Sequence, residues 1–327
     1  MGDSLPGLET LPAPAGPPLT LQHRQLARLL ELHQAWLLNT PTGVRADLTG
    51  QTLNDARFLQ ANLSKSILKS TTWLDADLSD ANLSGAVLAM ADLRGATLSR
   101  VDLSGADLER TRLDRAWLAG ANLSETVMQD TMLRESNLSG ARLMETSLNQ
   151  CDLTDAKLKG VSLHQARMFS CQFSGALLEE AVFYHARVQL SRFYGVNATR
   201  ANFTNATVQD CNFNKSEMSG SKFNRADLSR STFGHAVIAD ADFRDARLLG
   251  SDLYGAVLTR GRFGGAQLRA ADLRGANLLG ARELTSEQLS QARTDQSTIL
   301  PSGAHGPYVR RSGAERPALG IQPAVRL

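Results

Sequence analysis

The side chains best suited to chemistry in this sequence of 327 residues are three cysteines, six histidines and many serines and aspartates. A thiol or hydroxyl next to a histidine could act as a nucleophile, and grouped cysteines, histidines and carboxylates could hold a metal ion. The cysteines lie 20 and 40 residues apart, and the histidines are too scattered for a metal cluster by local spacing: His23, His33, His164, His185, His235 and His305. Whether any of these side chains converge depends on the elements that position them.

A five-residue repeat positions most of the side chains. Residues 91–110 read ADLRG, ATLSR, VDLSG and ADLER, so each five begins with a small residue and has leucine in its third position. With this third residue taken as the centre, the pattern runs from Leu48 to Leu278 through 47 consecutive fives without insertion or deletion. Every centre is apolar, and the residue two before it is small or slender nearly everywhere, Gln51 being the exception.

The three cysteines, Cys151, Cys171 and Cys211, all fall on the small position of the repeat. A buried thiol behaves as a small hydrophobic group. We therefore interpret the cysteines as packing residues and not as reactive thiols.

The repeat predicts a coil with short, straight sides. In an extended segment, residues two apart point to the same side, so the small position and the centre both face inward. The two residues after each centre are often Ser, Asp, Arg or Gly, which suit a bend. Each five then forms one side and one corner, and stacked coils pair their backbone groups with the coils above and below.

The phenylalanines indicate four sides in each coil. They recur at centres every ten residues from 173 to 243, with smaller centres such as Leu178 and Val188 between them. A coil of 20 residues places phenylalanine on two opposite sides, so that each ring stacks on the ring one coil away. A three-sided coil would mix large and small residues on every side and break this ladder.

The A(D/N)LxG pattern resembles the pentapeptide-repeat family over residues 46–280. The resemblance implies an all-β solenoid, a right-handed quadrilateral β-helix, here with nearly twelve 20-residue coils and short α-helical caps at both ends. The family also implies action through surface binding. Its relatives include proteins that protect gyrase by imitating duplex DNA, and others thought to be immunity or accessory proteins for secreted toxins.

The N-terminal residues are predicted to close the first coil. Residues 1–18 contain five prolines and are expected to form a disordered leader. Residues 19–40 are predicted to form a capping helix, with Thr20 as N-cap and apolar residues at helical spacing. The ELHQAWL segment is similar to the helix that precedes the first coil in many pentapeptide-repeat proteins.

The C-terminal residues are predicted to close the last coil. The repeat fails at Glu283, and residues 284–293 are predicted to form a second capping helix, with Thr285 as N-cap and Gln288 completing a capping box. Two alternatives stay open: this end only caps the solenoid and the protein is a monomer, or it also dimerises, as in some gyrase-protecting relatives. Residues 303–327 are expected to be a disordered tail.

Composition and architecture together exclude several function classes. A net charge of +2 gives no strong attraction to nucleic acid or anionic lipid. No apolar run approaches the roughly 18 residues that span a bilayer, and the N-terminus lacks the pattern of a secretory signal. A filled solenoid also offers no pocket for convergent catalytic groups. We expect a cytoplasmic protein without enzyme activity, with no catalytic, metal-binding or cofactor-binding residues, no cofactor, and no direct contact with nucleic acid or membrane.

The outward positions predict a patch for binding another protein. Residues twenty apart are neighbours in stacked coils, so aromatic side chains and arginines gather between residues 164 and 194. Such side chains are frequent in interface hot spots. The predicted partner-binding residues are His164, Arg167, Phe169, Tyr184, His185, Arg187, Gln189, Leu190 and Tyr194. The alternative interpretation is that the same residues are solvent-exposed side chains on the surface of the solenoid and bind no partner.

Charge patterning bears on the kind of partner. Residues 46–155 contain 16 Asp and Glu against 10 Lys and Arg, whereas residues 156–280 contain 10 against 16. A DNA mimic would need a continuous acidic surface, which the second half does not provide. We therefore expect a rod that antagonises or sequesters a bacterial protein, as an immunity or accessory protein for a secreted toxin such as a nuclease effector. A gyrase-protecting DNA mimic and a structural or assembly adaptor are the alternatives.

Overall fold

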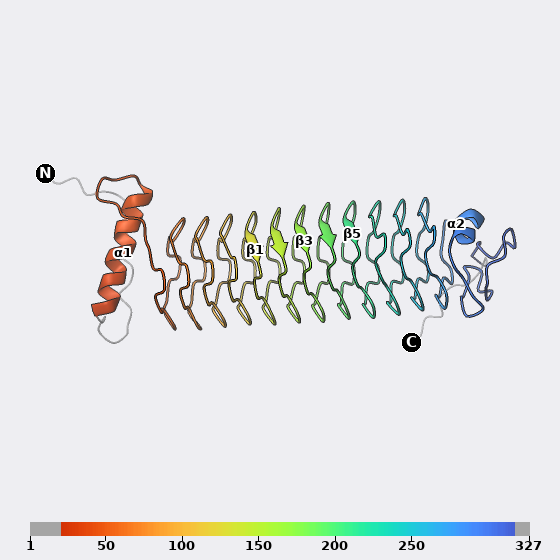
Figure 1. The fold of residues 1–327 in the computed structure, drawn as a ribbon, viewed down its shortest axis with the longest axis horizontal. Helices are drawn as coiled ribbons and strands as arrows, with labels where there is room; N and C mark the ends of the chain where they lie inside the picture. The colour runs from red at the N-terminus through yellow and green to blue at the C-terminus, as the bar shows by residue number, and fades with distance from the viewer. Residues whose placement is uncertain (1–20, 318–327) are drawn as a thin grey trace, which may run out of the picture. The chain divides into compact units, whose positions relative to one another are not determined.

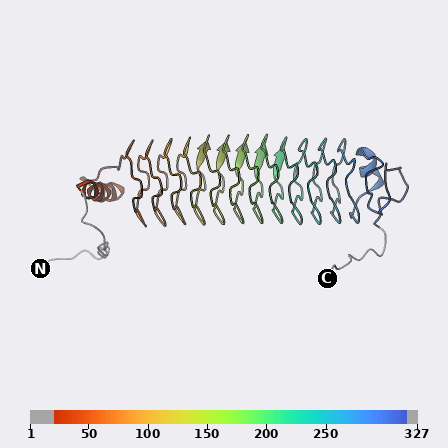
Figure 2. The same cartoon turned by 90° about the horizontal axis from the view of Figure 1, so that it is seen from below.

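The computed structural model describes residues 21–317 and contains two compact units, residues 1–46 and 47–327. The second unit is a parallel β-solenoid, seen as a stack of coils in Figures 1 and 2. This confirms the fold class expected from the repeat. The estimate of nearly twelve coils stays a prediction.

Among its described residues, the first unit contains one helix, α1 (Leu21–Leu37), which lies within the range predicted for a capping helix. After α1 the chain turns back along it, and the backbone N–H of Val44 donates to the carbonyl of Leu32 at 2.9 Å. Gly43 permits this return, since a Cβ there would stand 2.2 Å from the backbone nitrogen of Trp36. His33 is buried, and its Nδ1 accepts a hydrogen bond from the N–H of Ala46 at 3.0 Å. Thr20 and the leader, residues 1–18, lie outside the described residues, and the capping role of α1 stays a prediction.

The coils stack with a register of 20 residues, as the phenylalanine spacing predicts. Parallel bridges join each residue before a centre to its equivalent one coil later, from Asp47 and Ile67 to Arg262 and Arg282. On one side the bridges lengthen into a parallel five-stranded sheet in the order β1-β2-β3-β4-β5. The strands are β1 (Val127–Gln129), β2 (Ser147–Asn149), β3 (Arg167–Phe169), β4 (Arg187–Gln189) and β5 (Thr207–Gln209). We call the outer surface of this sheet the β-face.

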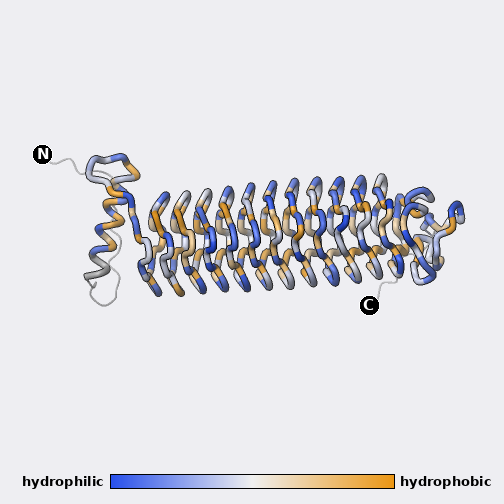
Figure 3. The backbone as a smooth tube through the Cα atoms, in the orientation of Figure 1, coloured by the Kyte–Doolittle hydropathy of each residue, from blue (hydrophilic) through white to orange (hydrophobic). Residues whose placement is uncertain are grey.

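The interior is filled by the centres of the repeat. Leucine and phenylalanine centres are almost completely buried, and polar and apolar residues alternate along each coil (Figure 3). Phe173 stacks on Phe193 with ring centroids 4.6 Å apart, and Phe183 stacks on Phe203 at 4.5 Å. The two ladders meet edge to face in the core, where Phe183 and Phe193 are 6.2 Å apart. The predicted phenylalanine ladder is confirmed.

The small inward position accommodates hydroxyl and thiol groups because nearby backbone carbonyls accept hydrogen bonds from them. The Ser66 hydroxyl donates to the Leu63 carbonyl at 2.6 Å, and the Thr111 hydroxyl donates to Leu88 of the coil before at 2.9 Å. The three cysteines are buried and free of disulfides. Burial raises the pKa of Cys211 to about 12, which keeps its thiol protonated at neutral pH.

The corners explain why Asp or Asn so often precedes a centre. The Asn62 side-chain oxygen accepts from the backbone N–H and the hydroxyl of Ser64, at 3.1 and 2.8 Å. The same local bond recurs in many corners and holds the chain in its bend. The last residue of most fives then adopts a positive φ, even where it is not glycine.

Helix α2 (Ser286–Gln291) follows the repeats, and its predicted capping box is present, whereas its role in closing the last coil stays a prediction. The Thr285 side chain accepts from the N–H of Gln288, and the Gln288 side chain accepts from the N–H of Thr285. The Gln288 amide also donates to the carbonyls of Phe263 and Ala266 at 2.8 Å, so α2 is fastened to the coils. Leu289, a residue of α2, is buried.

Residues 303–317 correct the expectation of a disordered tail. The chain folds back, so that Gly306 donates to Thr298 and Ser302 donates to Ala314 through backbone N–H groups. The Tyr308 hydroxyl donates to Glu315 at 3.0 Å. Glycine and proline content alone suggested disorder, but these long-range hydrogen bonds order the segment. Residues 318–327 lie outside the described residues.

Candidate protein-interaction surface

The centre of the β-face carries two arginines and an exposed aromatic ring. Arg167 of β3 is in register with Arg187 of β4, and Phe169 is in register with Gln189. Phe169 is 46% exposed although its neighbour Met168 is buried, because alternate residues of a strand point to opposite sides. Together with residues 147–149 of β2, these four side chains line a shallow groove of about 310 Å³.

A cluster of aromatic rings lies at the corner that leads into β3 and β4. The rings of His164 and Tyr184 stack at 5.4 Å, and the ring of His185 meets Tyr184 edge on at 4.3 Å. These residues come two to three positions before Arg167 and Arg187 in the chain, so the cluster borders the β-face. We call it the His–Tyr corner.

Leu190 lies at the edge of the β-face opposite the His–Tyr corner. It follows β4 directly, is 55% exposed, and has a φ of 53°. This left-handed conformation is unfavourable for leucine and common for glycine or asparagine. Neither packing nor backbone geometry therefore requires leucine at this corner.

Tyr194 is the member of the predicted set that the structure places elsewhere. It belongs to the next side of the coil, where the ammonium group of Lys215 lies 5.6 Å from its ring centroid. The coil turns a corner between Leu190 and Tyr194, which separates the two side chains. The remaining eight residues are continuous, and we call them the interaction patch: His164, Arg167, Phe169, Tyr184, His185, Arg187, Gln189 and Leu190.

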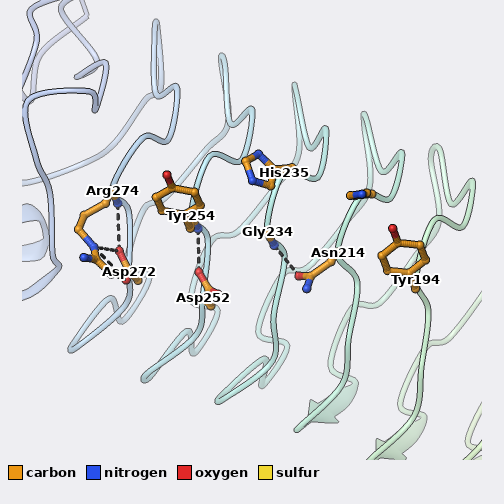
Figure 4. A pocket seen from close by; sticks show the side chains of 9 residues that line it. Tyr194, Asn214, Gly234, His235, Asp252, Tyr254, Asp272 and Arg274 are labelled. Carbon is orange, nitrogen blue, oxygen red and sulfur yellow. Dashed lines mark hydrogen bonds and ion pairs between the residues drawn. The ribbon is translucent and has the colours of Figure 1, made fainter.

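Tyr194 begins a second groove, which sequence reasoning missed and which Figure 4 shows. Its wall continues along the corner column twenty residues apart, through Asn214, Gly234, Tyr254 and Arg274. The His235 ring meets the Tyr254 ring edge on at 5.4 Å, and Arg274 forms an ion pair with Asp272 at 2.6 Å. We call this the tyrosine groove.

The hollow of the tyrosine groove lies at Gly234, where the column lacks a side chain. The N–H of Gly234 donates to the side-chain oxygen of Asn214 at 2.7 Å, and a Cβ at Gly234 would stand 3.2 Å from that oxygen. A comparison of residues twenty apart could have revealed this gap between two tyrosines. The groove contains charges of both signs, so it has no single electrostatic preference.

A third groove, in the first half of the solenoid, is lined by arginines whose charge is already balanced. Arg94 forms an ion pair with Asp92 at 2.7 Å, and Arg134 forms one with Asp152 at 2.6 Å. Although burial opposes ionisation of Asp92, the hydrogen bonds and charge of Arg94 outweigh it and lower the pKa of Asp92. This groove therefore offers less free positive charge than its arginine content suggests.

The described residues lack two other features that would point to a different kind of site. Within residues 21–317, no group of three or more histidines, cysteines or acidic residues could hold a metal ion. None of the helices described in that range is long and apolar enough to cross a membrane.

Comparison with protein-family models identifies the repeat. The model of pentapeptide repeats in eight copies matches residues 44–72, 76–183 and 221–282, and a model of the pentapeptide repeat region matches residues 166–238. The chain belongs to the pentapeptide-repeat family. The comparison with curated proteins gave no match.

Several solved structures of pentapeptide-repeat proteins are similar to this chain. HetL, from the cyanobacterium Nostoc sp. strain PCC 7120, is 22% identical, with 84% of this chain and 98% of HetL covered and a TM-score of 0.27. Full-length QnrB1, a plasmid-mediated fluoroquinolone resistance protein, is 15% identical, with 77% and 92% covered and a TM-score of 0.20. A protein of the Arabidopsis thaliana thylakoid lumen is 31% identical over 29% of this chain and 63% of its own, with a TM-score of 0.17.

Proposed function

We propose that this pentapeptide-repeat protein is a cytoplasmic, non-catalytic rod that antagonises or sequesters a bacterial protein, as an immunity or accessory protein for a secreted toxin such as a nuclease effector. The observation that carries the proposal is the interaction patch, in which eight predicted residues are continuous across one corner and the β-face. Aromatic and arginine side chains at exposed positions are typical of interface hot spots.

The scaffold beneath the interaction patch supports this role. The inward residues of β3 and β4, such as Met168 and Val188, are buried, and consecutive strands are joined in register. A surface held in this way loses little conformational entropy when a partner binds, so a modest patch can give useful affinity. Inhibition by covering a partner's surface also needs no chemistry from the rod.

Affinity capture tests the proposal. The tagged protein is expressed in its host, captured and analysed by mass spectrometry, and the captured partner is assayed for its own activity with and without the rod. We expect one dominant partner whose activity falls as the rod is added in stoichiometric amounts. The double variant Tyr184→Ala/Arg187→Ala should lose the partner.

A matched control uses the opposite side of the coil. Lys157 and Leu177 are also bridge partners on neighbouring coils, and Leu177 is 40% exposed. The variant Lys157→Ala/Leu177→Ala should capture the partner as well as the wild type does. A captured partner that keeps its full activity would instead support an adaptor. Capture of gyrase together with protection of supercoiling from a quinolone would support the DNA-mimic alternative.

A further inference from the structure

The β-face contains an unusual pairing of like charges. Two bridges in the described coils place arginine directly beside arginine: Arg167 with Arg187, and Arg262 with Arg282. In the second pair, Arg262 donates to the carboxylate of Glu283 at 2.8 Å. In the first pair, neither guanidinium group has a carboxylate within 4.0 Å among residues 21–317.

Several other arginines of the solenoid lie beside an acidic residue in the same column. Arg100 lies beside Asp80, and Arg230 beside Asp210, with nitrogen–oxygen distances of 2.6 and 2.7 Å. Like charges opposite one another on a sheet are destabilising, whereas opposite charges stabilise it. The fold therefore gains nothing from placing two arginines side by side at this position of the β-face.

We propose that the β-face of the interaction patch binds an acidic segment of the partner protein, in which two carboxylates engage Arg167 and Arg187 and an apolar side chain covers Phe169. This inference rests on the proposed function and adds the chemistry of the partner. Guanidinium groups bind carboxylates through two parallel hydrogen bonds. The two arginines are about 4.8 Å apart along the stack, so two carboxylates of one segment can reach both guanidinium groups.

The distribution of charge favours an acidic protein segment over nucleic acid. Along the column that contains Arg167 and Arg187, the outward residues between the two nearest carboxylates are uncharged apart from these arginines: Asp107, Val127, Ser147, Arg167, Arg187, Thr207 and Asp227. The positive region is thus closed at both ends by carboxylates about 29 Å apart. A phosphate backbone laid along the column would meet both of them, because nucleic acid carries charge continuously.

The apolar part of the β-face supports the same occupant. The ring of Phe169 lies in the same groove as the two arginines, and its neighbours Asn149 and Gln189 are uncharged amides. The Asn149 amide donates to Gln129 along the sheet, so these amides are arranged in a row. An acidic segment with one apolar side chain would bury that chain on Phe169 while its carboxylates reach the arginines.

Fluorescence polarisation tests this site without knowledge of the partner. The probes are a fluorescein-labelled 12-residue peptide with adjacent glutamates and one phenylalanine, the same peptide with glutamine for glutamate, and a labelled 12-nucleotide single-stranded DNA. We expect the acidic peptide to bind at least tenfold more tightly than either of the others. The variant Arg167→Gln/Arg187→Gln should weaken that binding at least tenfold, and Phe169→Ala should weaken it severalfold.

Arg192 provides the control, because it is exposed, lies on the next side of the coil and has no carboxylate within 4.0 Å in the described part of the chain. Arg192→Gln should leave peptide affinity within twofold of the wild type. Circular dichroism confirms that each variant is folded. Tighter binding of the DNA, equal binding of the amide peptide, an unchanged affinity in the double arginine variant, or no binding of the acidic peptide at 1 mM would each overturn the proposal.

The capture experiment separates failure of this site from failure of the proposed function. If Arg167→Gln/Arg187→Gln still captures and inhibits the wild-type partner, the acidic-segment site is wrong and the antagonist role stands. If the wild type captures nothing but binds the acidic peptide through the two arginines, the site stands and the antagonist role fails.

Discussion

At the scale of single residues, the inward positions and the corner positions of the repeat require different properties of a residue. Inward positions require apolar or small side chains that fill the interior of the solenoid, whereas the last residue of each corner requires only a backbone that tolerates a positive φ. Residues that satisfy neither demand are informative. Leu190 and Phe169 are large, apolar and exposed, and the repeat does not require them.

Phe203 tests the stacked core. It lies between Phe183 and Phe223, with centroid distances of 4.5 and 5.2 Å, and it is fully buried. Phe203→Ala should lower the free energy of unfolding by about 3–5 kcal/mol, since the stacked coils cannot collapse around the cavity. Phe169→Ala, at an exposed position, should change it by less than about 0.5 kcal/mol. Denaturant titration measures both, and similar losses in the two variants would contradict the ladder as the source of stability.

Leu190 tests whether an exposed corner residue serves binding. Leu190→Asn should keep or raise stability by up to about 1 kcal/mol, because asparagine adopts the left-handed conformation more easily. Partner capture should nevertheless fall. Leu177→Asn removes a comparably exposed leucine from the opposite side and should leave capture unchanged. A loss of stability in Leu190→Asn would show instead that this leucine is structural.

At the scale of elements, the C-terminal closure depends on a few polar contacts. Helix α2 is short, and its attachment relies on its capping box and on the amide of Gln288. The segment after α2 is held by Asp295, whose Oδ1 accepts from Gly275 and from Thr298 through backbone N–H groups, both at 3.1 Å. One carboxylate therefore joins this segment to the coil that contains Gly275.

Asp295 makes this closure sensitive to acid. Hydrogen bonds from Ser297, Gly275 and Thr298 lower the pKa of Asp295 to about 2, against an ordinary value of 3.8. The stabilisation is thus complete above about pH 4 and is lost as the pH falls through about 2. Hydrogen-exchange protection at Gly275 and Thr298 should fall between pH 4 and pH 2, and Asp295→Asn should remove most of this pH dependence. Protection at Val188, within the sheet, serves as the reference, and a parallel fall there would point to global unfolding.

At the scale of the whole solenoid, stability should follow the register of 20 residues. Each coil contacts only its neighbours, so removing one complete coil leaves every column continuous. Deletion of residues 201–220 places Phe223 on Phe183 and leaves the interaction patch intact. We expect this variant to fold with a similar melting temperature and to capture the same partner.

Deletion of residues 201–205 alone should be far more damaging. It moves every later residue to the next side of the coil, so that Phe213 stacks on Val188 and Phe223 stacks on Ala198. Both phenylalanine ladders are then interrupted, and the core must accommodate mismatched volumes. Thermal unfolding followed by circular dichroism compares the two deletions. Equal melting temperatures would mean that any apolar centre is enough for stability and that stacking phenylalanine on phenylalanine in neighbouring coils adds nothing.

Much of this structure was determined by the sequence alone, because a five-residue repeat leaves few geometries that bury every centre and pair every backbone group. The spacing of phenylalanines fixed the 20-residue register, and the motif at Thr285 and Gln288 fixed the start of α2. The 20-residue register in turn predicts that Arg167 lies beside Arg187, because the two residues are twenty positions apart.

The tertiary structure decided what counting could not reveal. Ion pairing depends on how far and in which direction each side chain extends, so only the tertiary structure distinguishes the unpaired Arg167 and Arg187 from the paired Arg94 and Arg134. The order of residues 303–317 comes from hydrogen bonds between distant parts of the chain, which local composition does not encode. Counting in twenties locates Gly234 in the column of the tyrosine groove, but the tertiary structure shows that Asn214 accepts a hydrogen bond from the Gly234 N–H and that His235 contacts Tyr254.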